Sequence, residues 1–156
     1  KGVGSIVRAA QFMKGIMNAL EEHNVDLVVL AGFLSILSKE FIEKYRNGII
    51  NVHPSLIPAF CGEGYYGQKV HKAVLEYGAK VSGATVHFVD EGADTGPIIL
   101  QEAVKVEEND TPETLAARVL TVEHKLLPEA VRLYCEGELI IEGRKVRIAE
   151  KYLKYI

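Results

Sequence analysis

Three polar residues of this sequence have the types that acyl transfer to an amine requires. Asn51 and His53 come at the end of an apolar run, and Asp94 lies in a later polar loop. An imidazolium and an amide N–H can together hold the oxyanion of a tetrahedral intermediate, at about 3–4 kcal/mol per well-placed donor. The imidazole can also pass a proton to the leaving nitrogen, and a carboxylate beside it is expected to raise its pKa. These residue types therefore indicate acyl transfer without a covalent intermediate.

Each of these residues, taken alone, also has an ordinary structural explanation. Asn51 suits a turn, Asp94 suits a loop, and a single histidine after a strand is most often a satisfied structural one. His87 alternates with apolar neighbours in a strand pattern, which favours packing or support of a site over catalysis. Cys61 has no neighbour that would lower the pKa of its thiol. Residue spacing alone predicts a polar site and leaves its chemistry open.

Helices and short buried strands alternate along the chain, as in an α/β fold. We expect helices over residues 7–22, 38–45, 70–77 and from 111 onward, strands over 26–31, 48–52, 81–89 and 97–106, and a terminal hairpin from 139–141 and 146–148. The predicted fold is an open, largely parallel sheet with flanking helices. In such sheets ligands bind beyond the carboxyl ends of the strands, which would bring Asn51, His53 and Asp94 into one crevice.

The helical patterns also predict which side chains are buried. Val70, Val74 and Tyr77 recur at helical spacing, so they should form the buried face of the third helix. His71 and the later His124 are then expected at the surface. Pro128 is expected to kink or break the last helix, because a proline in a helix interior removes a hydrogen bond.

Length and composition limit the class of protein. With 156 residues, 48% of them hydrophobic and 25% charged, the chain is predicted to form a single domain over residues 1–156. A net charge of −3 argues against a nucleic-acid partner, and no apolar run approaches the roughly 20 residues of a membrane span. Two distant cysteines without metal-ligand spacing favour a reduced, cytoplasmic protein that binds no metal. Because the chain begins at Lys1, we expect it to be incomplete at its N-terminus. The sequence leaves the oligomeric state open.

Four stretches, in the same order, resemble a known family. "NVHPSLIPAF" resembles the formyltransferase signature Asn-x-His-Pro-Ser-Leu-Leu-Pro, and "DEGADTGPIILQ" resembles the Asp-x-Gly-Pro-Ile element that follows it. "DLVVLAGFLSILS" precedes them and "TPETLAARVLTVEHKLLPEAV" follows, so the resemblance covers roughly Leu20 to Val146. The family is that of the phosphoribosylglycinamide formyltransferases of purine biosynthesis. The resemblance implies transfer of a formyl group from the cosubstrate 10-formyltetrahydrofolate to the amine of glycinamide ribonucleotide.

The resemblance also implies a role for each matching position. Asn51 would hold the oxyanion, His53 would donate the proton, and Asp94 would sustain the charge of the histidine. His87 would lie behind the catalytic group, and Glu123 would contact the ribonucleotide. The folate would lie against Leu34, Ser35, Ile36, Leu37, Ile49, Asp90, Glu91, Gly92 and Ala93.

The sequence departs from the family in two places. Many members have arginine where this chain has Ser35, so a side-chain contact to the folate tail is expected to be missing. The family binds the substrate phosphate with a glycine-rich turn after its first strand. Here only the start of the chain, "KGVGSIVRAA", has a comparable glycine pair, and no strand precedes it. The resemblance therefore covers the folate chemistry better than it covers binding of the ribonucleotide.

Two other functions stay open at this point. Formyltetrahydrofolate deformylase shares the folate side and hydrolyses the formyl group, but it resembles "NIHHS", with a second histidine where this chain has Pro54. A non-catalytic folate-binding fragment is the other alternative, and an unfilled sheet edge would make it prone to association. A metal hydrolase using His53, His71 and Asp94 has no recognised spacing, and a serine hydrolase would need Gly-x-Ser-x-Gly.

Overall fold

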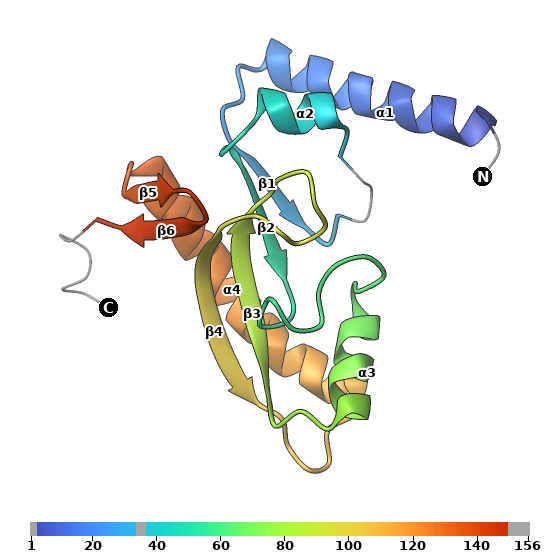
Figure 1. Cartoon of the computed structure of the whole chain (residues 1–156), viewed down its shortest axis with the longest axis vertical. Helices are drawn as coiled ribbons and strands as arrows, with labels where there is room; N and C mark the ends of the chain where they lie inside the picture. Colours follow the sequence, from blue (N-terminus) through green and yellow to red (C-terminus); the bar gives the residue numbers. More distant parts are fainter. Residues whose placement is uncertain (1–2, 34–36, 150–156) are drawn as a thin grey trace.

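The computed structural model describes residues 3–33 and 37–149. Its helices and strands follow one another in the order α1 (Val3–Glu22), β1 (Val28–Ala31), α2 (Lys39–Lys44), β2 (Ile49–His53), α3 (Gln68–Tyr77), β3 (Val81–Phe88), β4 (Ile98–Lys105), α4 (Pro112–Cys135), β5 (Leu139–Glu142) and β6 (Lys145–Ile148). Figure 1 shows the strands in the middle of the molecule, with α1 and α2 at one end and α3 at the other. The predicted α/β fold is confirmed.

The strands form one open, six-stranded sheet in the order β1-β2-β3-β4-β6-β5. β1 pairs with β2 in parallel, and β4 pairs with β6 in parallel. The other three neighbouring pairs are antiparallel. The sheet is therefore mixed, which corrects the prediction that it is largely parallel. Two of the three antiparallel pairs, β3–β4 and β5–β6, are joined by short connections, which suit antiparallel neighbours, whereas parallel ones need a long crossover.

Local sequence signals explain where the helices begin and end. The Thr111 hydroxyl accepts a hydrogen bond from the Thr114 N–H, and the Thr114 hydroxyl accepts one from the Thr111 N–H, which closes the start of α4. Ser38 caps α2 in the same way, and Gly78 ends α3 in the left-handed conformation. Pro128 lies inside α4, which continues to Cys135, so of the predicted kink or break the break does not occur.

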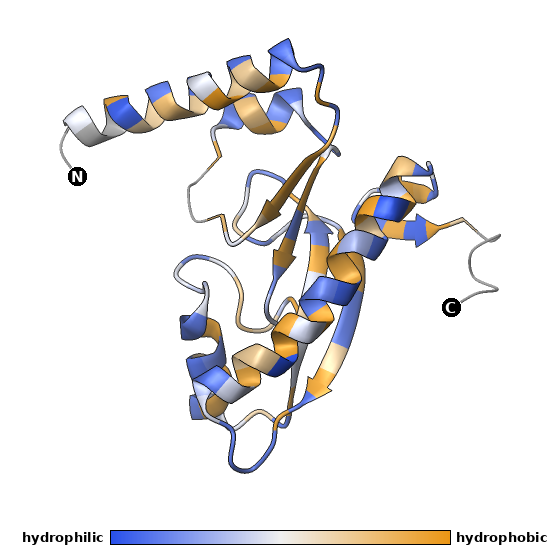
Figure 2. Ribbon diagram, turned by 180° about the vertical axis from the view of Figure 1, so that it is seen from behind, coloured by the Kyte–Doolittle hydropathy of each residue, from blue (hydrophilic) through white to orange (hydrophobic). Residues whose placement is uncertain are grey.

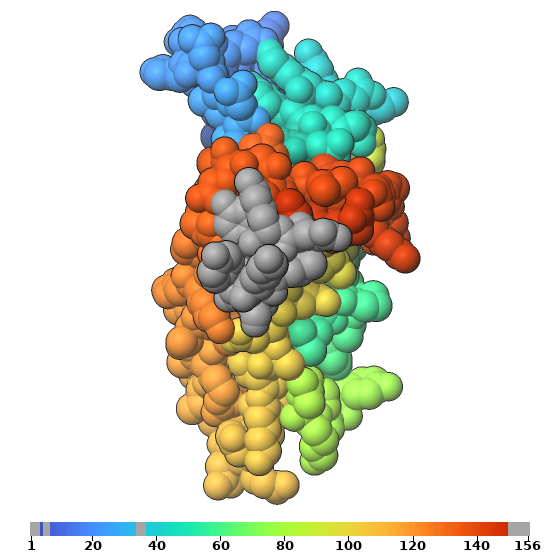
Figure 3. All heavy atoms as spheres, turned by 90° about the vertical axis from the view of Figure 1, so that its left-hand side faces the viewer, coloured from blue at the N-terminus to red at the C-terminus, as the bar shows by residue number. Residues whose placement is uncertain are grey.

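Helix α4 covers one face of the sheet. Leu115, Val119 and Leu126 face the strands and pack against Ile50, Val86 and other residues of the main hydrophobic core. Figure 2, seen from behind, shows α4 running across the sheet. Figure 3 shows the β5–β6 hairpin beside the end of α4, below α1 and α2. The buried side of this helix contains Leu115, Val119, Val122, Leu126, Ala130 and Leu133.

Helices α1 and α2 form a smaller core on the other face. Met13 and Met17 of α1 and Phe41 of α2 pack with Ile49 of β2, whose side chain is fully buried. Phe12 of α1 lies away from this core and is 53% exposed. No helix among the described residues combines the length and the apolar character needed to cross a lipid bilayer.

Candidate active site

Strand β2 presents its polar residues on one face of the sheet. Side chains two residues apart on a strand point the same way, so Ile49, Asn51 and His53 share a face. Asn51 lies opposite His87 of β3, and His53 lies opposite Thr85. The catalytic pair predicted from the sequence therefore lies on β2, next to the antiparallel strand β3.

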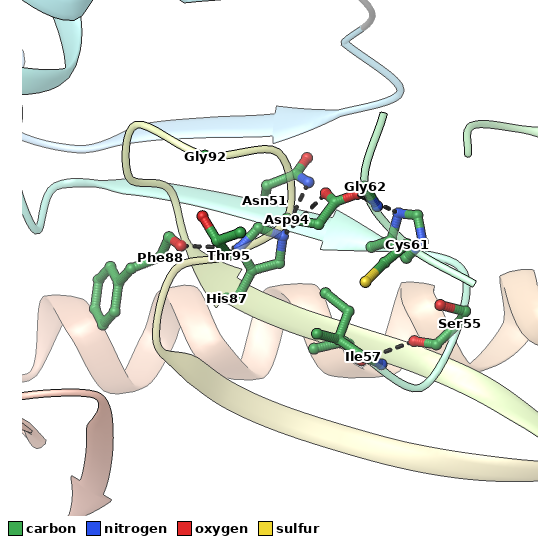
Figure 4. Close-up of polar contacts among 12 residues, drawn as sticks. Asn51, Ser55, Ile57, Cys61, Gly62, His87, Phe88, Gly92, Asp94 and Thr95 are labelled. Atoms are coloured by element: carbon green, nitrogen blue, oxygen red, sulfur yellow. Dashed lines mark hydrogen bonds and ion pairs between the residues drawn. The ribbon is translucent and has the colours of Figure 1, made fainter. Parts of the chain in front are cut away.

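Asp94 lies between two histidines. Its Oδ2 is 3.5 Å from Nδ1 of His53, and its Oδ1 is 3.6 Å from Nε2 of His87. The Gly62 N–H donates to Oδ2 at 2.9 Å. Figure 4 shows the side chains of Asn51, His87 and Asp94 turned toward one another. The structure thus brings together all three predicted catalytic residues and the predicted supporting histidine.

The loop that carries Asp94 is held tightly against β3. The Asp90 carboxylate accepts hydrogen bonds from the Gly92 N–H at 3.1 Å and from the Thr95 hydroxyl. A Cβ at Gly96 would lie 1.7 Å from the Phe88 carbonyl oxygen, so only glycine fits there. Asp94 itself has φ +57°, a left-handed conformation that non-glycine residues seldom adopt. Such backbone strain is concentrated at functional sites.

His87 is buried with both ring nitrogens engaged. Its Nδ1 donates to the Phe88 carbonyl at 2.8 Å, and Nε2 lies 3.3 Å from Nδ2 of Asn51. Nδ2 of Asn51 carries two hydrogens, so donation of one to His87 leaves the other for a ligand. His87 therefore orients Asn51, and its Nε2 lies beside Asp94.

His53 is positioned by the loop that follows it. Its Nε2 donates to the Phe60 carbonyl at 2.9 Å. Phe60 has φ +50°, and the Ser55 hydroxyl also lies 3.3 Å from the same carbonyl oxygen. The loop is anchored to the sheet because the Thr85 hydroxyl donates to the Ser55 carbonyl at 2.7 Å and accepts from the Ile57 N–H at 3.1 Å.

The pKa of His53 is lowered overall, although Asp94 acts to raise it, as predicted from the sequence. Burial disfavours the charged imidazolium and is the largest effect, while the Phe60 carbonyl and the Asp94 charge act against it. The side chain of His53 is 95% buried, so the loss of hydration outweighs the attraction of the carboxylate. For Asp94, burial would raise the pKa, but the neighbouring His87, the hydrogen bond from the Gly62 N–H and the nearby His53 together lower it. At neutral pH the site thus holds an ionised Asp94 beside a neutral His53.

A cleft of about 1000 Å³ opens over these residues. Asn51, His53, His87 and Asp94 all line it, and so does Glu123 of α4. The residues predicted to bind the folate that also line it are Leu37, Asp90, Glu91, Gly92 and Ala93. The remaining predicted folate contacts Leu34, Ser35 and Ile36 lie outside the described residues.

Ile49 does not line the cleft, which corrects its predicted contact with the folate. Helices α1 and α2 cover its side chain completely, so it supports the cleft from below.

Glu123 lies in the wall of the cleft, where its carboxyl is partly removed from water. Burial raises the pKa of its carboxyl, and His124 only partly offsets this.

Sequence reasoning missed His71, which is 4% exposed and lines the cleft. The buried face of α3 contains Val70, His71 and Val74, whereas Tyr77 is 82% exposed. The helix is therefore rotated relative to the predicted apolar face. The signal available in the sequence was that His71 is three residues before Val74, a spacing that puts both on neighbouring positions of one face.

Cys61 remains a poor nucleophile. Burial and the nearby Asp94 charge both raise the pKa of its thiol, which keeps it protonated at neutral pH. Across residues 3–33 and 37–149, no group of three or more His, Cys, Asp or Glu side chains is arranged to hold a metal ion.

Comparison with known proteins identifies the family. The family model described as formyl transferase matches residues 5–131. The chain belongs to the formyl transferase family. It is 53% identical over 124 residues to the chloroplastic phosphoribosylglycinamide formyltransferase of Arabidopsis thaliana, which is 80% of this chain and 42% of that relative. This formyl transferase chain thus spans about two fifths of the plant protein.

Solved structures give the same result for the fold. The glycinamide ribonucleotide transformylase 1 of Symbiobacterium toebii is 47% identical with a TM-score of 0.83, over 89% of this chain and 63% of that one. A formyltetrahydrofolate deformylase from Pseudomonas syringae is 30% identical with a TM-score of 0.81, over 88% of this chain and 45% of that one. The fold is therefore shared by formyl transferases and a deformylase, and the two activities need separate arguments.

Proposed function

We propose that this chain transfers the formyl group of 10-formyltetrahydrofolate to the amine of glycinamide ribonucleotide. The observation that carries the proposal is the placement of Asn51, His53 and Asp94 in one cleft, with the carboxylate 3.5 Å from the imidazole. The names and identities of the relatives support the same substrates, and the resemblance to the plant enzyme is stronger than that to the deformylase.

The proposed reaction requires the protein to stabilise an oxyanion and to transfer one proton. The amine attacks the formyl carbon, the bond from that carbon to N10 of the folate breaks, and one proton passes from the amine to N10. The free hydrogen on Nδ2 of Asn51 stabilises the oxyanion that forms in between. His53, neutral before the reaction, takes the proton from the attacking amine and releases it to N10, and the Asp94 charge stabilises the imidazolium meanwhile.

The residues at the β1 and α2 end of the cleft fit a flat heteroaromatic cosubstrate. Leu30, Leu37 and Val89 supply apolar wall, and the loop over residues 90–93 supplies backbone polar groups. Such a mixture of apolar surface and a few fixed polar groups is what small-molecule sites offer. We assign the folate to this end and propose that Glu123, on α4, contacts the ribonucleotide.

The test measures tetrahydrofolate release from 10-formyltetrahydrofolate with and without glycinamide ribonucleotide. The proposal expects release only when the ribonucleotide is present, together with formylated ribonucleotide in equal amount. Release at the same rate with water alone would instead identify a deformylase. Binding of the folate without any release would identify a non-catalytic fragment.

A further inference from the structure

His71 is a buried imidazole that the proposed mechanism does not use. It comes from α3, it is 4% exposed, and it lines the same cleft as His53. Its Nδ1 is fully buried and has no hydrogen-bond partner among the residues that the structure describes. A buried polar atom without a partner costs about 1–3 kcal/mol, so packing alone gives no reason to keep a histidine in this wall, and the residue also lines the cleft.

The other two histidines of the cleft do not share this property. His53 donates to the Phe60 carbonyl, and His87 donates to the Phe88 carbonyl and lies beside Asn51. Both are therefore held by the protein itself. Among the described residues that line the cleft, His71 alone has a fully buried side-chain polar atom without a hydrogen-bond partner.

The position of His71 indicates which substrate it would meet. The proposed folate wall comes from β1, α2 and the loop over residues 90–93, at one end of the cleft. His71 belongs to the opposite end, where α3, the loop over residues 62–67 and the first turns of α4 form the walls. Figure 1 shows α3 and the start of α4 together at the end of the molecule away from α2. Glu123, the proposed ribonucleotide contact, also belongs to α4.

The charge of His71 limits the chemistry of its partner. Burial and the nearby His53 both lower the pKa of His71, so the imidazole is neutral near pH 7. A neutral imidazole has one N–H donor and one acceptor nitrogen. It matches a hydroxyl or an amide, which can donate and accept, better than it matches a phosphate, which would favour a cation.

We propose that His71 binds the formyl acceptor through a hydrogen bond from its ring to an uncharged hydroxyl or amide group, and so determines which acceptors the cleft takes. The inference rests on the proposed function and goes beyond it, because it assigns α3 a part in acceptor recognition. His71 is then a specificity-determining residue, and the proton transfer stays with His53.

The experiment compares His71→Phe, His71→Asn and the control His23→Phe by steady-state kinetics with both substrates varied. Phenylalanine fills the space without a hydrogen-bonding atom, whereas asparagine retains a donor and an acceptor near the position of Nδ1. His23 is exposed and lies outside the cleft. We expect His71→Phe to raise KM for glycinamide ribonucleotide roughly tenfold, the loss of one hydrogen bond. KM for 10-formyltetrahydrofolate should stay within about twofold, and His71→Asn should recover most of the loss.

Unfolding by denaturant gives a second, independent reading. Because His71→Phe removes an unpaired polar atom, the protein should be at least as stable as the wild type. A clear loss of stability would show that the imidazole is already satisfied within the folded protein, and would overturn the inference. An unchanged KM for the ribonucleotide in His71→Phe would also overturn it, while leaving the proposed function intact.

The proposed function fails separately, if the wild type shows no release that depends on the ribonucleotide. Calorimetric titration with glycinamide ribonucleotide then decides the inference. Binding by the wild type that His71→Phe weakens would support it. Equal binding by both proteins, or none by the wild type, would overturn it.

Discussion

The two faces of the sheet are covered to different extents. On the α4 face, Ile50 and Val52 of β2 are both buried in one continuous core. On the other face, α1 and α2 bury Ile49 completely, but their cover ends before Asn51, which is only partly buried. The cleft begins where the helical cover stops. The same strand therefore serves as core on one side and, over its last three residues, as the floor of a site on the other.

This difference separates stability from chemistry within five residues of β2. Removing an atom from the covered part should cost folding free energy, because packed cores relax only partly around a cavity. Removing a polar group from the uncovered part should lower the reaction rate. Each of the following changes tests one side of that division.

The largest effect is expected from His53→Ala. With no group to carry the proton between the amine and N10, kcat should fall roughly 1000-fold or more. Folate binding, measured by fluorescence titration, should change by less than about threefold, because the apolar wall is untouched. A variant that keeps a near-normal rate would remove His53 from the mechanism.

Ile49→Ala tests the covered side of the same strand. Loss of a fully buried isoleucine should lower the free energy of unfolding by about 2–5 kcal/mol, measured by urea denaturation. Val29→Ala is the matched control, because Val29 is 42% exposed on neighbouring β1. If both changes cost the same, Ile49 is not the packed support that the structure describes.

Asp94→Asn should have a smaller effect on rate, roughly 10- to 100-fold. The amide oxygen can still accept from the Gly62 N–H, but the charge that opposes the desolvation of His53 is lost. The pKa of His53 should then fall further, so the midpoint of the pH–rate profile assigned to His53 should move to lower pH. An unchanged profile would show that Asp94 does not act on this histidine.

The smallest effect concerns stability in mild acid. His53 and His71 both have a pKa below the ordinary 6.5, so the folded protein binds fewer protons than the unfolded chain. Their contribution to stability must therefore decline as the pH falls below about 6.5 toward the lowered pKa values. Urea unfolding at pH 7 and pH 5 should show this decline, and His71→Phe should show less of it. The Asp94 contribution is lost only in stronger acid, below its ordinary 3.8, because its pKa is also lowered.

Much of the site could be predicted from the sequence because its parts are carried by short, ordered motifs. Asn51 and His53 are two residues apart on one strand, so they must share a face. The rule that ligands bind beyond strand ends suggested Asp94 as their partner and the resemblance gave it a role, but no local rule predicts that its loop folds back onto β2. Its approach depends on Gly96 and on the left-handed Asp94 backbone, which are tertiary features.

The sequence failed where tertiary packing changes a local preference. The apolar spacing of α3 put Tyr77 on the predicted buried face, whereas the packed helix buries His71 with Val70 and Val74 and leaves Tyr77 exposed. The same limit applies to the pKa of His53. The charge of Asp94 could be anticipated, but the burial of His53 depends on the loop that brings the Phe60 carbonyl to its ring.

The Phe60 carbonyl has one more consequence, for the tautomer of His53. Because Nε2 must carry a hydrogen to donate to that carbonyl, neutral His53 has its lone pair on Nδ1, facing Oδ2 of Asp94. A lone pair and a carboxylate repel each other, and a single proton between them removes that repulsion. His53 and Asp94 should accordingly titrate as one unit that takes up one proton. The left-handed backbone at Phe60 thus keeps Nδ1 of His53 free to accept a proton beside Oδ2 of Asp94.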